Sequence, residues 1–315
     1  MLSLADFRNL RSLYDRFRHS RHLHEDRMTV EYKVRDRVLL LPDDHRLPEY
    51  QKNSPTYDMV FDPIYEAVGS HTPGRYFIDV GANVGDTAVV MRHNAANPIL
   101  CVEGHPRFLE YLRHNTRGLA DVKVTPTFIG VDEMAGAALQ FESRGGTGAF
   151  ASTPDKDAAP STMTSSLRQI LEDSDALRCG IALFKPDTDG LDAFILRDLL
   201  AIEELSPALF FECDLVQTLF EEHGESVWRQ NFDTLEKRGY SLIIFDNFGY
   251  RMAGCLPGSY DLVWELNRYI AMQHANRFVH TYYLDIWAFP PEMAAIFEAS
   301  RTHLRPDAAE LIRRP

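Results

Sequence analysis

The sequence predicts an α/β fold in which a mostly parallel sheet is covered by helices on both faces. From about residue 56 onward, short apolar runs alternate with segments of helical periodicity. Such alternation is typical of strand–helix–strand units, whose crossover helices pack on the sheet. Two early runs, FIDV at 77–80 and ILCVE at 99–103, carry an acidic residue near the carboxyl end. In open parallel sheets the ligand lies at that edge, so we expect the functional site there.

The individual elements follow from the hydrophobic period of each segment. The predicted strands are 77–80, 99–103, 122–130, 181–186, 208–214, 241–246 and 281–289. The predicted helices are about 84–95, 106–117, 190–202 and 225–237.

Composition divides the chain into three parts, with the sheet in residues 56–290 as the central domain. Residues 1–55 form an Arg- and His-rich extension of helical and extended character, and residues 291–315 a helical tail. The helical pattern within residues 1–22 fits either a helix packed on the protein, which we favour, or peripheral contact with a membrane. The polar stretch 143–168 is either a lid over the site or a tolerated insertion.

Charge and cysteine usage exclude several classes of protein. The chain has 33 basic and 46 acidic residues, for a net charge of −13, which argues against a nucleic-acid-binding surface. Its four cysteines show no CxxC spacing, so neither a zinc site nor a disulfide framework is indicated. We expect no transmembrane segment and no secretion signal, and therefore a cytoplasmic protein.

The loop after the first central strand, in YFIDVGANVGDTAVVM (76–91), resembles a nucleotide-binding turn but departs from the dinucleotide pattern. That pattern, GxGxxG, needs a second glycine where this chain has Asn83, between Gly81 and Gly85. The Asn83 side chain would crowd a pyrophosphate. An NAD-dependent oxidoreductase is therefore the disfavoured alternative.

Two carboxylates refine the expected ligand. Asp79 lies beside the loop, where a carboxylate suits an ammonium better than a phosphate. Glu103 ends the next strand, the position from which an acidic residue bonds ribose hydroxyls. Together they predict a nucleoside with an amino group and no bridging phosphates, which S-adenosylmethionine satisfies. His105 is expected near the adenine. The structural alternative is a tight turn at 81–85 and a solvated strand end at Glu103.

Six blocks, in order, resemble the FkbM-type S-adenosylmethionine-dependent methyltransferases over about residues 56–290. They are FIDVGANVGDTA, VEGHPRFLEYLRHN, LFKPDTDGLDAFIL, PALFFECD, IIFDNFG and YYLDIWAFP. The resemblance implies a class I methyltransferase fold, which is Rossmann-like and has a seven-stranded sheet with one antiparallel strand. It also implies O-methylation of a sugar hydroxyl on a glycan, glycolipid or glycosylated metabolite.

Departures from the family pattern keep a third class open. Asp189 stands where the family has Glu in Asp-x-Glu-Gly, Asp192 where a Glu is common, and Arg168 where an Asp is usual. The alternative they allow is a non-catalytic protein that uses the fold to bind a partner.

Methyl transfer to a hydroxyl needs either a general base or a metal that lowers the hydroxyl pKa. We expect Asp187 to be the base, with Lys185 and Glu212 beside it and paired with each other across adjacent strands. The open alternative is a Mg²⁺ site that uses Asp187 and Asp214.

The acceptor is expected to contact polar and aromatic residues at the same edge of the sheet. These candidates are Asp189, Asp214, Asp246, Asn247 and Tyr250. His274 and His280 are interpreted as structural.

Overall fold

The computed structural model describes residues 29–54, 59–131, 139–144, 147–152, 164–188, 190–215 and 224–303. The predicted helix in residues 1–22, half of the 143–168 stretch and Asp189 lie outside these ranges.

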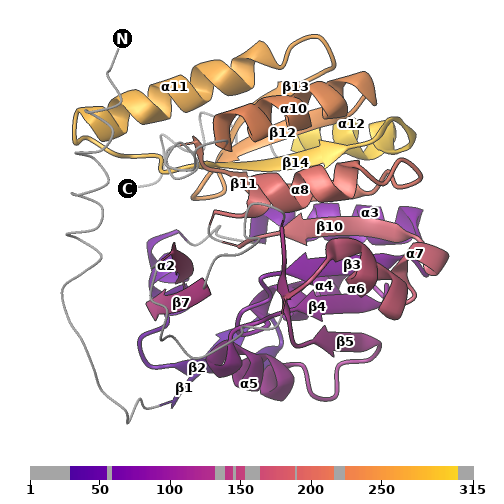
Figure 1. Ribbon diagram of the computed structural model, residues 1–315, viewed down its shortest axis with the longest axis vertical. Coiled ribbons are helices and arrows are strands. Elements are labelled where there is room, and N and C mark those ends of the chain that lie inside the picture. The colour runs from indigo at the N-terminus through magenta and orange to yellow at the C-terminus, as the bar shows by residue number, and fades with distance from the viewer. Residues whose placement is uncertain are drawn as a thin grey trace.

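An eight-stranded sheet forms the centre of the molecule (Figure 1). Its spatial order is β13 (Arg251–Cys255), β12 (Ser241–Asp246), β14 (Leu284–Phe289), β11 (Ala208–Cys213), β10 (Ile181–Pro186), β3 (Tyr76–Val80), β4 (Ile99–Val102) and β5 (Val122–Thr125). Neighbouring strands from β11 to β5 are parallel, and β14 runs antiparallel to both β11 and β12. The predicted class I methyltransferase fold is confirmed, with one correction: the sheet has eight strands rather than seven.

The additional strand is β13, which returns along β12 as an antiparallel hairpin. Gly249 allows the tight turn because its φ of 81° lies in the left-handed region. Since β14 is antiparallel to both its neighbours, β12 runs parallel to β11, and Asp246 ends at the same edge as the central strands.

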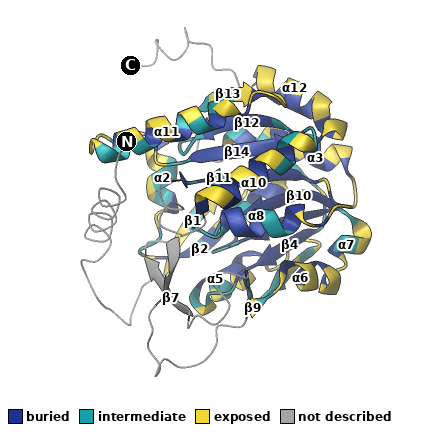
Figure 2. Ribbon diagram, turned by 45° about the horizontal axis from the view of Figure 1, so that its top comes forward, coloured by how far each residue is buried: buried dark blue, intermediate teal, exposed yellow. Residues whose placement is uncertain are grey.

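Helices cover both faces of the sheet, and each layer buries its own apolar cluster. One face carries α6 (Leu167–Asp173), α7 (Ala176–Cys179), α8 (Asp192–Leu200), α10 (Gly224–Lys237) and α11 (Asp261–Ala275). The other carries α3 (Asp62–His71), α4 (Asp86–Asn94), α5 (Pro106–Asn115) and α12 (Ala294–His303). Figure 2 shows buried strands between helices whose outer sides are exposed. Among the helices that the structure describes, none combines the length and apolar character that a membrane span requires.

A column of aromatic side chains fills the second layer beneath β11, β12 and β14. Trp287 stacks on Phe210 with ring centroids 4.9 Å apart, and Phe61 lies 5.1 Å from Phe245. Such rings bury much apolar area and fix strand positions through their shape.

Several elements differ from the sequence prediction. The expected strand 122–130 is interrupted between β5 and β6 (Phe128–Ile129), because Pro126 has no amide hydrogen to continue the ladder. Short β6 instead pairs with β9 (Thr164–Ser165).

The last strand begins at Leu284 rather than 281. Hairpin β7–β8 (Leu139–Arg144 and Thr147–Ser152) overlaps the beginning of the polar stretch 143–168. The short turns η1 (Met59–Phe61) and η3 (Pro291–Met293) precede α3 and α12.

Residues 29–54 pack on the sheet domain. They form the hairpin β1 (Thr29–Val34) and β2 (Arg37–Pro42), followed by α2 (Leu47–Asn53). Leu39, Leu41 and Leu47 are buried in the same cluster as α4 and α5.

Asn115, the last residue of α5, joins the hairpin to the central loop. Its amide nitrogen donates to the carbonyl oxygens of Leu40 (2.9 Å) and Val84 (2.8 Å), and its Oδ1 accepts from the Leu40 amide at 2.8 Å. This buried side chain therefore satisfies three backbone groups that would otherwise lack a partner.

We predict that Asn115→Ala lowers the free energy of unfolding by about 2–4 kcal/mol, because buried backbone groups lose their partners. Chemical denaturation measures the loss. Asn276→Ala is the control, because this exposed side chain bonds one helix carbonyl, and its effect should stay within about 0.5 kcal/mol. Equal effects of the two substitutions would contradict the prediction.

Candidate functional site

A pocket opens at the carboxyl edge of the sheet, where β3, β4 and β10 end. Its walls come from the loops after these strands, from β6 and from the start of α8. The lining residues are Val80, Gly81, Asn83, Val102, Glu103, Gly104, Phe108, Thr127, Phe128, Ile129, Asp187, Thr188, Leu191 and Ile195. The pocket therefore lies where the sequence predicted the site.

The glycine turn after β3 forms one wall and is tightly packed. Gly81 has φ of +80°, and a Cβ there would lie 1.8 Å from the carbonyl oxygen of Asp187. The amides of Gly81 and Ala82 both donate to the Val102 carbonyl, at 2.9 and 3.1 Å. The turn is thus fixed between β4 and the loop after β10, and glycine is required by both backbone conformation and space.

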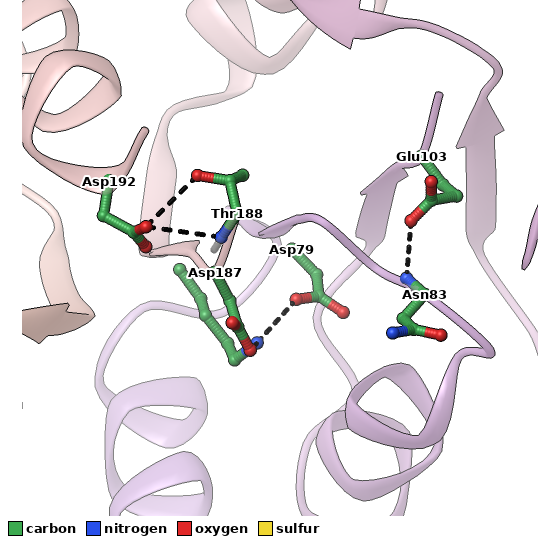
Figure 3. Close-up of polar contacts among 7 residues, drawn as sticks. Asp79, Asn83, Glu103, Asp187, Thr188 and Asp192 are labelled. Carbon is green, nitrogen blue, oxygen red and sulfur yellow. Dashed lines mark hydrogen bonds and ion pairs between the residues drawn. The ribbon is translucent and has the colours of Figure 1, made fainter. Parts of the chain in front are cut away.

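Glu103 holds this turn from the end of β4. Its Oε2 accepts from the amide of Asn83 at 2.8 Å (Figure 3). Its Oε1 accepts from the amide of His105 at 2.6 Å. Burial raises the pKa of Glu103 to about 7, against the lowering effect of these amides. Each carboxylate oxygen keeps a further lone pair, and the side chain lines the pocket, so it can also accept from a ligand hydroxyl.

Gly104, the next residue, lets an aromatic ring close over the strand end. A Cβ at Gly104 would lie 2.1 Å from the ring of Phe128, which also lines the pocket. The ring centroids of His105 and Phe108 lie 4.9 Å apart. Burial, and to a smaller extent the positive charge of Arg107, lowers the pKa of His105 to about 4. His105 is therefore neutral near pH 7.

A buried ammonium joins the two central strands. Lys185 Nζ lies 3.2 Å from Asp79 Oδ1 and 2.8 Å from Asp187 Oδ2. Figure 3 shows the Asp79 and Asp187 side chains side by side. Burial lowers the pKa of Lys185, but Asp187 and Asp79 outweigh it and raise that pKa well above its usual value. We expected Glu212 as the partner of Lys185. In the structure Asp79 stands directly opposite Lys185 in the β3–β10 ladder, and the ammonium bonds to Asp79 and Asp187.

Asp79 lies behind the glycine turn and does not line the pocket. Its side chain is fully buried, and burial raises its pKa to about 6 against the opposing effect of Lys185. Its Oδ2 has no hydrogen-bond partner within the described part of the chain. Asp187, with 38% of its side chain exposed, is the member of this group that faces the pocket.

Asp192 shapes the pocket in a way that the sequence did not predict. This buried residue begins α8, and its Oδ2 accepts from the Thr188 hydroxyl (3.2 Å), the Thr188 amide (3.4 Å) and the Gly190 amide (3.3 Å). Burial, with the nearby Asp187 charge, raises its pKa to about 6. The only sign of this role in the sequence is an acidic residue two positions after the Asp-x-Asp-Gly block. An acidic residue at the start of a helix is common and does not by itself indicate a site.

The remaining candidates lie at the same edge but do not line this pocket. Asp214 follows β11, and Glu212 stands opposite Asp285 of β14. Asp246 Oδ1 accepts from the amides of Phe248 and Tyr250, so it stabilises the β12–β13 turn.

Next to that turn, Asn247 Oδ1 accepts from the Tyr282 amide at 2.9 Å, and Tyr250 is exposed. His274 and His280 lie at and beyond the end of α11, where the His280 amide donates to Gln273.

A metal site finds no support in the described ranges. They contain no group of three His, Cys, Asp or Glu side chains that could hold a metal ion. Asp187, the first ligand of the alternative that we considered, instead bonds to the Lys185 ammonium.

No family model and no curated protein matches the chain. Solved structures with a similar arrangement include an O-methyltransferase from Bacillus cereus in complex with SAH, at 7% identity and a TM-score of 0.40, covering 92% of each chain. They also include the O-methyltransferase TomG from Streptomyces achromogenes in complex with SAM, at 11% identity, a TM-score of 0.40 and coverage of 77% of this chain and 89% of that one. A putative O-methyltransferase from Klebsiella pneumoniae has 9% identity, a TM-score of 0.38 and coverage of 77% and 90%. Because these identities and TM-scores are low, the function has to be inferred from this chain's own residues.

We predict that Gly81→Ala destabilises the protein by about 1–3 kcal/mol more than Gly74→Ala, because its added methyl group meets a backbone carbonyl. Gly74 is the matched control: its φ is +79°, and no atom lies within 4 Å of an added Cβ. Thermal or chemical unfolding measures both variants. Equal losses would show that Asp187 does not restrict Gly81.

A second prediction concerns pH. The folded-state pKa of Glu103 is about 7, above the ordinary value of 4.5, so the folded protein binds more protons than the unfolded chain between these values. Its contribution to stability therefore falls as pH rises from about 4.5 to 7. As the pH rises across this range, the free energy of unfolding of Glu103→Gln should increase by about 1–3 kcal/mol relative to that of the wild type.

Denaturation series at several pH values test this, with Glu110→Gln, which removes an exposed carboxylate from α5, as the control. A Glu103→Gln curve that stays parallel to the wild-type curve would overturn the assignment.

Proposed function

We propose that the protein is an S-adenosylmethionine-dependent O-methyltransferase of the FkbM type that methylates a sugar hydroxyl. The observation that carries this is the pocket at the ends of β3, β4 and β10, with Glu103 and Asp187 on its walls. A carboxylate at the end of the second central strand is the group that accepts from ribose hydroxyls.

The charge of the site suits a cationic donor. Four carboxyl groups, those of Asp79, Glu103, Asp187 and Asp192, lie in or directly behind the pocket, with one ammonium, Lys185, among them. A ligand with a sulfonium and an ammonium would offset this excess of negative charge, whereas a pyrophosphate would add to it. The left-handed Asn83 in the turn also keeps a side chain where a dinucleotide needs glycine.

The protein's part in methyl transfer would be to orient the acceptor and remove its proton. Bound S-adenosylmethionine supplies an activated methyl group. Asp187 faces the pocket and can accept the proton of an acceptor hydroxyl. Lys185 fixes the Asp187 carboxylate at 2.8 Å, and the close packing of Gly81 against the Asp187 carbonyl fixes its backbone. Such fixed placement is the main contribution a protein makes to an in-line displacement.

The sugar acceptor is proposed from the resemblance to the family and from the β12–β13 turn. This turn presents Asn247 and the exposed ring of Tyr250 at the carboxyl edge of the same sheet. An amide beside an aromatic face suits a sugar, which has both hydroxyl groups and apolar C–H surfaces. Asp189 and Asp214 belong to the same proposed acceptor side.

We predict that the wild-type protein binds S-adenosylhomocysteine in calorimetry and transfers labelled methyl groups from S-adenosylmethionine to glycan or glycolipid fractions. Asp187→Asn should keep binding within about threefold and lower transfer by about 100-fold or more, the usual contribution of a general base. Glu103→Ala should lose binding, because the ribose hydroxyls lose their acceptor.

The matched control is Glu110→Ala, on the exposed side of α5, which should leave both measurements unchanged. Absence of binding at millimolar concentration by the wild type would exclude the proposal. An active Asp187→Asn variant would remove Asp187 from the mechanism while leaving the cofactor assignment intact.

A further inference from the structure

We propose that His45, in the loop between β2 and α2, is a positioning residue that fixes Asn83 and thereby sets the affinity of the pocket for its nucleoside cofactor. This inference rests on the proposed function. It assigns part of the cofactor site to a segment that precedes the sheet domain in the sequence.

The hydrogen bonds of His45 define its tautomer. Its Nδ1 lies 3.2 Å from the amide nitrogen of Leu47, which can only donate, so Nδ1 is an acceptor without a hydrogen. In neutral imidazole the hydrogen is then on Nε2, which lies 3.4 Å from Oδ1 of Asn83. With this tautomer, His45 donates and Asn83 Oδ1 accepts across a long contact.

Neutral histidine agrees with its surroundings. Burial lowers the pKa of His45, while Asp86, Asn83 and Asp44 act to raise it and Arg107 to lower it. The ring also packs edge-on against Phe108 at 6.4 Å. The ring is thus half-buried against α5.

Contacts from two sides fix the conformation of Asn83. Its φ is +46°, in the left-handed region, which asparagine adopts more readily than most residues with a Cβ. The backbone amide is held by Glu103 and the side chain by His45. Constraints from two sides keep Asn83 at the pocket wall, and loss of one would let the turn relax.

The segment that carries His45 is itself anchored at the site. Asp44 forms an ion pair with Arg107 of α5 at 2.6 Å, and Asn115 bonds both Leu40 of β2 and Val84 of the turn. His45 does not line the pocket, whereas Asn83 does. Of the two pocket-lining residues that His45 contacts, Phe108 meets only the edge of the ring, whereas Asn83 is joined to it by a hydrogen bond, so we assign the effect of His45 to Asn83.

The test measures the affinity for S-adenosylhomocysteine by calorimetry, so the acceptor does not have to be known. His45→Ala should weaken binding about tenfold, within the range of coupling energies between contacting residues. His45→Gln, whose amide can donate in place of Nε2–H, should restore affinity to within about threefold of the wild type. His93→Ala, which removes a partly exposed histidine from α4, should leave affinity unchanged.

A double-mutant cycle separates positioning from a general structural effect. Asn83→Gly removes the accepting side chain while tolerating the positive φ. In this background His45→Ala should change affinity by less than about twofold. If it still weakens binding tenfold, or if His45→Gln binds as poorly as His45→Ala, the inference is wrong.

A second measurement is independent of ligand binding and of variants that fail to fold. Nitrogen chemical shifts of the His45 ring in the ligand-free protein should show the neutral tautomer with hydrogen on Nε2. A protonated ring, or hydrogen on Nδ1, would overturn the inference. If the wild type binds no S-adenosylhomocysteine but shows the expected tautomer, the proposed function fails and the contact between His45 and Asn83 stands.

Discussion

The buried contact of Lys185 with Asp79 and Asp187 is the constraint on which the rest of the site depends. Removing an ammonium from water is costly, and the cost is recovered only when carboxylates surround it with good geometry. Here one carboxylate comes from β3 and the other from the residue directly after β10, so the ion group fixes two strands and one loop together. The apolar layers determine that a sheet forms, and this ion group determines how its edge is arranged.

The acidic residues of the site have different roles, which follow from how deeply each one is buried. Asp79 is buried behind the turn, Glu103 and Asp192 hold loop amides, and Asp187 faces the pocket. The inner carboxyl groups have raised pKa values because burial disfavours their charge. Asp79 and Asp192 shape the site from behind the pocket, whereas Glu103 and Asp187 line it and can meet a ligand.

The sequence predicted the central strands well because their apolar runs are short and bounded by helical patterns. The strands 181–186 and 241–246 were predicted to the residue. Helix α4 begins at Asp86, two residues later than expected, because left-handed Gly85 precedes it. The short strand β13 and helix α11 were missed: β13 is five residues long, and α11 exposes Tyr269 and Met272 on its outer side, which obscures its period.

Site residues close to a recognisable turn or strand end could be found from the sequence, and those contributed by distant segments could not. Glu103 was predicted because it directly ends a strand. The partner of Lys185 was assigned wrongly, because β3 and β11 both flank β10 and the choice between them depends on the register of the strands. No local pattern connects His45 with Asn83, which are 38 residues apart in the chain.

The positions of the indole side chains have a practical consequence for spectroscopy. Trp228 and Trp287 are fully buried, and Trp264 lies against the guanidinium of Arg229, all in the half of the molecule built on β11, β12 and β14. None of the chain's three tryptophans lines the pocket. Their intrinsic fluorescence should therefore change when that half of the core loosens. It should change little when a small molecule binds in the pocket of the opposite half.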